Sequence, residues 1–126
     1  MMVTAGLMFD MLSSCSSLPV YKTQLNKNVA AVPLALFEKG DLQIIRVADL
    51  GYDIALHKKN QDLYTALLLQ CTHAENELVS TGNGYICNLH GSRFNTNGDV
   101  VEGPADRSLK KFVTTVNDTH IIISIS

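Results

Sequence analysis

The chain has 126 residues, a mass of 13.8 kDa and a formal net charge of −2. This length fits one domain with a short tail, and 46% hydrophobic residues can form a core without a disulfide scaffold. The balance of 10 Lys and Arg against 12 Asp and Glu excludes the basic surface of a nucleic-acid-binding protein. No apolar run approaches the roughly 18 residues of a membrane-spanning helix. We therefore expect a small globular domain with a compact functional site.

Residues 1–28 differ in composition from the rest and are expected to form an N-terminal tail. Residues 1–12 are short and apolar, and residues 12–15 resemble the lipobox of bacterial lipoproteins, in which the cysteine is acylated. No Lys or Arg precedes Cys15, and Asp10 interrupts the apolar run, so the charged start of a signal peptide is missing. Two interpretations stay open: a protein anchored on the extracytoplasmic side of the cell envelope through lipidated Cys15, or a cytoplasmic protein with a free thiol there.

From about Val29 onward the sequence is typical of an all-β protein. Val, Ile and Thr make up 27 of the 126 residues, and turn residues separate short apolar segments. Alternation along residues 52–57 indicates a strand with one buried face, and the continuous leucines at 67–69 indicate a strand covered on both sides. The expected strands are 29–37, with Pro33 at an edge or bulge, then 41–47, 52–58, 63–70, 112–116 and 120–125, the last two joined by a turn at Asn117 and Asp118.

Residues 71–107 interrupt the strand pattern with a stretch rich in Gly, Asn and Asp, and this stretch contains two Cys/His pairs. Cys71 and His73 form a C-x-H unit, and Cys87 and His90 form a C-x-x-H unit. Zinc accepts two thiolates and two imidazoles, although its sites usually pair like residues within one unit. A two-iron centre instead takes two thiolates on one iron and two imidazoles on the other. A disulfide between Cys71 and Cys87 is the third possibility.

Three motifs together resemble the loops of the Rieske [2Fe–2S] family. They are C-T-H at 71–73, C-N-L-H-G-S at 87–92 and G-P-A at 103–105, a combination that rarely occurs by chance. The resemblance covers residues 29–126, nearly the whole chain apart from its tail. It implies an all-β fold, an antiparallel sandwich or barrel base with a small inserted subdomain that binds the cluster at about residues 71–107.

The same resemblance implies a Rieske-type [2Fe–2S] cluster with two Cys and two His ligands. Cys71 and Cys87 would bind one iron, His73 and His90 the other, and Pro104 would lie in a loop that packs over the cluster. Two ferric ions, two sulfides and two thiolates make a neutral oxidised centre, which accepts an electron more readily than a dianionic centre with four thiolates. The reduction potential is therefore expected within about −150 to +300 mV.

The sequence departs from the quinol-oxidising branch of the family at two places. That branch carries a disulfide between the cluster loops, whose cysteines would fall at Asn76 and Leu89, so this link is absent here. It also places two hydroxyls near the cluster sulfurs; Ser92 keeps the first, and Phe94 stands where the second, a tyrosine, would be. Because a hydrogen bond to a sulfur stabilises the reduced state, we expect a potential between those of the low-potential Rieske ferredoxins and the quinol-oxidising proteins.

The function that the resemblance implies is one-electron transfer by a small ferredoxin-like carrier or an accessory subunit of a redox chain, with redox proteins as partners. No catalytic residue is expected. Residues 108–126 are too few to build the two-His-one-carboxylate iron domain of an oxygenase, so a role in such a system would be that of its ferredoxin component. A zinc-stabilised interaction module with the same four ligands is the alternative from a different class.

Overall fold

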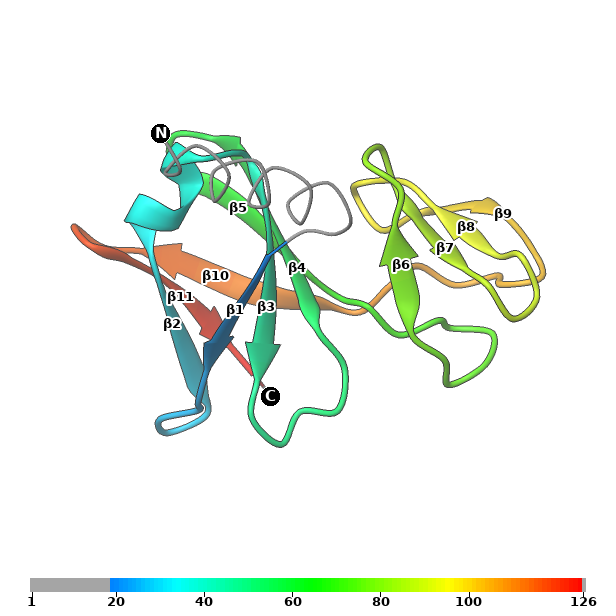
Figure 1. Cartoon of the computed structure of the whole chain (residues 1–126), viewed down its shortest axis with the longest axis horizontal. Coiled ribbons are helices and arrows are strands. Elements are labelled where there is room, and N and C mark those ends of the chain that lie inside the picture. The colour runs from blue at the N-terminus through cyan, green and yellow to red at the C-terminus, as the bar shows by residue number, and fades with distance from the viewer. Residues whose placement is uncertain (1–18, 126) are drawn as a thin grey trace, which may run out of the picture.

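The structure, a computed structural model, describes residues 19–125 and contains two β-sheets in that range (Figure 1). The larger sheet has seven strands in the order β1-β3-β4-β5-β10-β11-β2 and curls into a nearly closed barrel. Neighbouring strands are antiparallel except β1 and β3, which are parallel. The strands are β1 (Val20–Thr23), β2 (Val29–Pro33), β3 (Leu42–Val47), β4 (Ile54–Asn60), β5 (Leu63–Leu68), β10 (Lys111–Val116) and β11 (His120–Ser124).

The smaller sheet lies beside the barrel and has four antiparallel strands in sequence order (Figure 1). The chain leaves the barrel after β5 and returns to it at β10, and these two strands pair with each other, Lys111 opposite Leu67 and Phe112 opposite Ala66. The insertion therefore begins and ends at one place on the barrel. The four strands are β6 (Leu78–Ser80), β7 (Tyr85–Cys87), β8 (Arg93–Phe94) and β9 (Val100–Glu102).

Two hydrophobic clusters hold these sheets together. The first fills the barrel and includes the fully buried Ile45, Ile54 and Leu56. The second lies between barrel and small sheet and combines barrel residues with both cysteines of the insertion. Its members are Ile44, Ala55, Leu67, Leu69, Cys71, Leu78, Tyr85, Cys87, Phe94, Ala105 and Leu109. The predicted ligand loops are thus attached to the barrel by apolar packing, which is the main stabilising contribution in a fold of this size.

The all-β prediction is confirmed, and the leucines at 67–69 are buried on both sides of the sheet as expected. The expected single buried face of residues 52–57 is wrong at Ala55, which is fully buried because the small sheet covers the outer side of β4. The expected strand over residues 29–37 ends at Pro33, and a 3-10 helix, η1 (Leu34–Glu38), follows it.

The segment assigned to the tail contributes a strand to the barrel. β1 (Val20–Thr23) pairs with β3, Val20 opposite Ile44 and Thr23 opposite Val47. Residues 1–18, which include the lipobox-like motif and Cys15, lie outside the described residues. Among residues 19–125 no helix is long and apolar enough to cross a membrane.

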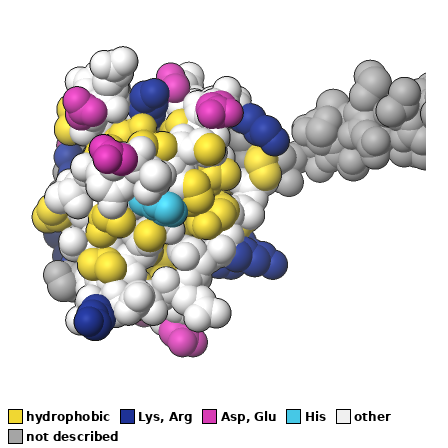
Figure 2. All heavy atoms as spheres, turned by 90° about the vertical axis from the view of Figure 1, so that its left-hand side faces the viewer, with side chains coloured by type: hydrophobic (Ala, Val, Ile, Leu, Met, Phe, Trp, Pro, Cys, Tyr) yellow, Lys and Arg dark blue, Asp and Glu magenta, His cyan; other side chains and the backbone are white. Residues whose placement is uncertain are grey.

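On the barrel face turned away from the small sheet, hydrophobic side chains are scattered among polar groups, with charged side chains mostly at its edges (Figure 2). Partly buried hydrophobic side chains packed against the barrel core include Leu34, Leu36 and Val116. None of the predicted ligands with a described position belongs to the barrel strands. The chemistry expected from the sequence is therefore confined to the inserted subdomain.

We expect His57 on β4 to make the stability of the barrel depend on pH. Its ring Nδ1 is buried and has no hydrogen-bond partner among the described residues. Burial lowers the pKa of His57 below its ordinary value near 6.5, the positive charge of Lys59 lowers it further, and Asp41 opposes them. A lowered pKa means that the unfolded chain binds a proton first as the pH falls, so stability is lost below about pH 6.5.

We therefore expect the His57→Gln variant to lose less stability than the wild type between about pH 7 and pH 5. Urea unfolding followed by circular dichroism at both pH values measures the difference, and His120→Gln, on β11, is the matched control. Equal acid losses in the wild type and His57→Gln would contradict this role for His57.

Candidate metal centre

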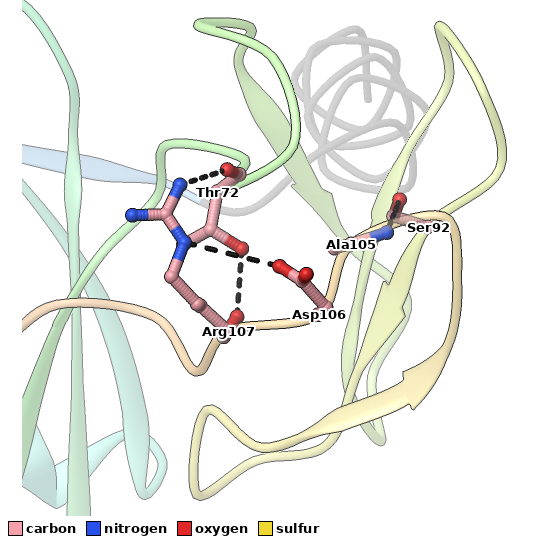
Figure 3. A network of polar contacts seen from close by, with 5 residues as sticks. All are labelled: Thr72, Ser92, Ala105, Asp106 and Arg107. Atoms are coloured by element: carbon pink, nitrogen blue, oxygen red, sulfur yellow. Dashed lines mark hydrogen bonds and ion pairs between the residues drawn. The ribbon is translucent and has the colours of Figure 1, made fainter.

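Three loops meet at one end of the inserted subdomain, and Figure 3 shows the polar contacts that join them. The first, residues 69–77, connects β5 to β6; the second, residues 88–92, connects β7 to β8. The third, residues 103–110, leads from β9 back to β10. The three motifs found in the sequence thus occupy three loops that are neighbours in space.

Backbone hydrogen bonds within the first loop leave one of its candidate ligands buried and the other exposed. The Cys71 backbone N–H donates to the Asn76 carbonyl oxygen at 2.8 Å, and the Asn76 N–H donates to the Ala74 carbonyl at 2.6 Å. This places Cys71 inside the second hydrophobic cluster, where it is buried, and leaves His73 exposed.

The second loop has the same arrangement. The Cys87 N–H donates to the Ser92 carbonyl at 2.8 Å, and the Gly91 N–H donates to the Cys87 carbonyl at 2.9 Å. Gly91 has φ +85°, a left-handed conformation that explains the glycine after the histidine in the motif. Cys87 is fully buried and His90 is exposed.

The two loops bring like residues together. Cys71 and Cys87 are free thiols within hydrogen-bonding contact of each other, so the disulfide interpretation is not borne out. The imidazoles of His73 and His90 lie with ring centroids 5.2 Å apart at an interplanar angle of 78°. No three His, Cys, Asp or Glu side chains of residues 19–125 form a group able to hold a single metal ion. The arrangement is two pairs, sulfur inside and nitrogen outside.

The surroundings of Cys87 favour the thiolate that a metal ligand must become. Burial, the largest single influence, acts to raise the pKa of the Cys87 thiol. Hydrogen bonds from the backbone N–H groups of Leu89 and His90, from the Asn76 amide and from Cys71 act against it, and the net pKa is lowered. The loop thus provides donors aimed at a negatively charged sulfur.

Tyr85 adds no negative charge to the hydrophobic cluster that contains Cys87. It is buried on β7 opposite Phe94, and its hydroxyl has no hydrogen-bond partner among the described residues. Burial raises the pKa of Tyr85 to about 12, so the phenol stays neutral at physiological pH.

Ser92 joins the second loop to the third. It is the one buried polar residue among those described, and its Oγ accepts a hydrogen bond from the Ala105 N–H at 3.0 Å (Figure 3). Pro104, next to Ala105, is exposed at the surface of the third loop. Because Oγ uses a lone pair for Ala105, the Ser92 hydroxyl hydrogen remains free to donate elsewhere.

A second link, which the sequence did not predict, joins the first and third loops. The Thr72 Oγ1 donates to the Arg107 carbonyl at 2.7 Å, and the Arg107 Nη2 donates to the Thr72 carbonyl at 2.8 Å (Figure 3). Arg107 also faces Asp106, but at 3.9 Å and with both side chains largely exposed this pair contributes little. In the sequence, the only indication of this link is Thr72, a residue with a hydroxyl group between Cys71 and His73.

Replacing Ser92 with alanine is expected to destabilise the subdomain by about 1–3 kcal/mol, because the buried Ala105 N–H loses its acceptor. Thermal unfolding of Ser92→Ala against the exposed control Ser108→Ala measures this loss. Equal melting temperatures would contradict the structural role of Ser92.

Comparison with known proteins agrees with this geometry. The family model of the Rieske [2Fe-2S] domain matches residues 22–113, well over half of the chain. The chain is 42% identical over 45 residues to the cytochrome b6-f complex iron-sulfur subunit of one Prochlorococcus marinus strain, which covers 36% of this chain and 25% of the relative. Against the same subunit from strain NATL1A it is 30% identical over 108 residues, which covers 82% of this chain and 60% of the relative. The chain thus spans less than two thirds of the length of these relatives.

Two solved structures share the fold. One is the cyanobacterial plasma membrane Rieske protein PetC3 from Synechocystis PCC 6803, with a TM-score of 0.60 and 21% identity, covering 73% of this chain and 94% of that chain. The other is a complex of reduced oxygenase and oxidized ferredoxin in carbazole 1,9a-dioxygenase, with a TM-score of 0.58 and 18% identity, covering 79% and 94%. At these identities the likeness concerns the fold.

Proposed function

The chain belongs to the Rieske [2Fe-2S] domain family, and we propose that it transfers single electrons as a small carrier or as an accessory subunit of a redox chain. The family implies a Rieske-type [2Fe-2S] cluster bound by Cys and His. For this reason the zinc-stabilised module considered from the sequence is not proposed. The observation that carries the proposal is the convergence of two buried thiols and two exposed imidazoles from two loops.

The residues present fit such a cluster in donor type and in arrangement. Cys71 and Cys87 lie together inside, and His73 and His90 lie together at the surface, which matches one iron with two thiolates and one with two imidazoles. We propose these four as the ligands, with Ser92 and Pro104 beside them. When bound, the cluster supplies a centre that gains and loses one electron.

The chain's own residues would serve this electron transfer in two ways. The apolar cluster around Cys71 and Cys87, which includes Leu78 and Phe94, keeps water away from the thiolates. The exposed edges of His73 and His90 place the nitrogen ligands where a partner protein can approach. Burial on one side and exposure on the other would therefore direct electron exchange to the histidine side.

The partners and the location of the protein are inferred from its relatives in general terms. Relatives of this chain are iron-sulfur subunits of a redox complex, and one structural neighbour is a plasma membrane protein. We propose that this chain works with protein redox partners at the cell envelope. Attachment through a lipid on Cys15 is supported by the motif at residues 12–15.

A potentiometric titration of anaerobically purified protein tests the function. We expect one reversible one-electron step, followed by visible absorption, with a midpoint inside about −150 to +300 mV and between the extremes of the family. A colourless protein that binds zinc in place of iron would contradict the proposal. A coloured protein that is not reduced within this range of potentials would also contradict it.

A further inference from the structure

Asn76 contacts both ligand loops at once. Its backbone carbonyl accepts the Cys71 N–H at 2.8 Å, which fixes Asn76 at the end of the first loop. Its side-chain Nδ2 reaches across to the second loop and donates to the Cys87 Sγ at 3.6 Å, a distance suited to a sulfur acceptor. One residue thus joins the backbone of one candidate ligand to the sulfur of the other.

We propose that Asn76 is a positioning residue that holds the two ligand loops together and raises the reduction potential through its hydrogen bond to Cys87. The part concerning the potential rests on the proposed function. Cys87 is fully buried, and a charge-assisted hydrogen bond in such surroundings is stronger than one exposed to water. Reduction adds negative charge that the sulfurs share, so a donor aimed at Cys87 stabilises the reduced state more than the oxidised state.

β6 and β7 pair beside the two loops, with Leu78 opposite Cys87, and the rings of His73 and His90 are also neighbours. Apart from the contact of the two cysteines, the Asn76 bond to Cys87 is the one side-chain hydrogen bond between the first and second loops among the described residues.

Thr72 and Arg107 join the first loop to the third, and Ser92 and Ala105 join the second to the third. The contact between the two cysteine side chains needs a thiol hydrogen, which both lose when they bind a metal. The amide of Asn76 keeps its hydrogens, so it would still have a hydrogen to donate to Cys87 in the metal-bound protein.

Asn76 also stands at one of the two positions where the quinol-oxidising branch carries its disulfide, the other being Leu89. Leu89 is 56% exposed and offers no polar group to the first loop. The chain thus joins its ligand loops by a hydrogen bond to the ligand sulfur itself, where that branch uses a covalent bond beside the ligands. Such a link adds a donor to the sulfur, which a disulfide does not.

The variant Asn76→Leu tests both parts of this inference. It keeps the backbone contact with Cys71 and removes the donor to Cys87. We expect the variant to take up the cluster. Its equilibrium constant for reduction should be about tenfold smaller, which corresponds to a potential lower by about 59 mV for one electron. In the presence of a chelator, it should lose its visible absorption several-fold faster than the wild type. Asn97→Leu, at an exposed asparagine outside the three motifs, is the matched control and is expected to behave as the wild type.

The outcomes separate this inference from the proposed function. A wild type that takes up no cluster overturns both. A wild type with a normal cluster, together with an Asn76→Leu variant of unchanged potential and loss rate, overturns the role of Asn76 alone. If Asn76→Leu takes up no cluster while Asn97→Leu does, the double variant Asn76→Cys/Leu89→Cys decides. Cluster retention when its disulfide is oxidised, with faster cluster loss after the disulfide is reduced, supports the link. Failure to retain the cluster when oxidised overturns it.

Discussion

The Cys87→Ser variant is expected to bind no [2Fe–2S] cluster and to show no visible absorption. Cys87 is fully buried among apolar side chains, and four hydrogen-bond donors lower the pKa of its thiol in spite of that burial. A serine hydroxyl, with a pKa far above that of a thiol, would stay protonated there and offer iron a hard, neutral oxygen in place of a soft thiolate. Anaerobic reconstitution, followed by absorption and iron analysis, measures the loss.

The third cysteine of the chain provides the control for this prediction. Cys15 lies outside the described residues and outside the three motifs, so Cys15→Ser should bind iron as the wild type does. Retention of the full visible spectrum by Cys87→Ser, or its loss in Cys15→Ser, would contradict the ligand set proposed for the two loops.

The Gly84→Ala variant is expected to lower the stability of the inserted subdomain. The loss should be no smaller than the cost of overpacking a core, which is about 1–3 kcal/mol. Gly84 is buried just before β7, and an added Cβ would collide with the backbone carbonyl oxygen of Phe94. That carbonyl belongs to β8, which pairs with β7 through Tyr85 and Phe94, so it cannot move without disturbing the small sheet. Since Cys87 ends β7, we also expect weaker cluster retention.

Thermal unfolding followed by circular dichroism measures this effect, and a fall in the melting temperature on the order of 10 °C is expected. Gly40→Ala is the matched control, because a Cβ at Gly40 meets no atom within 4 Å and its backbone is not left-handed. It should change stability by no more than about 0.5 kcal/mol. Equal melting temperatures for the two variants would show that the small sheet can absorb the added methyl group.

Much of the fold could be predicted from local patterns in the sequence. The run of leucines at 67–69 indicated a strand covered on both sides, and the turn at Asn117 joins two strands as expected, its N–H donating to the His120 carbonyl. The burial of Ala55 could not be foreseen, because it depends on the small sheet, which is distant in sequence. The strand β1 was missed for a similar reason, since its four residues form a strand by pairing with β3.

The candidate site divides in the same way. Cys71, His73, Cys87 and His90 could be selected from the sequence because metal chemistry restricts which residue types can stand at such spacings. The residues that support them could not. These residues are Asn76, Thr72 and Arg107, which form hydrogen bonds between loops that are far apart in the chain. Many polar residue types can form such bonds, so the sequence alone does not show which residues lie where the loops meet.

We propose that two sulfur and two nitrogen side chains from neighbouring loops bind the two irons asymmetrically. Pulsed paramagnetic resonance of the dithionite-reduced wild-type protein tests it most directly. We predict a rhombic signal with two strongly coupled nitrogens, which belong to His73 and His90. The absence of any signal, or a signal with no strong nitrogen coupling, would contradict the claim.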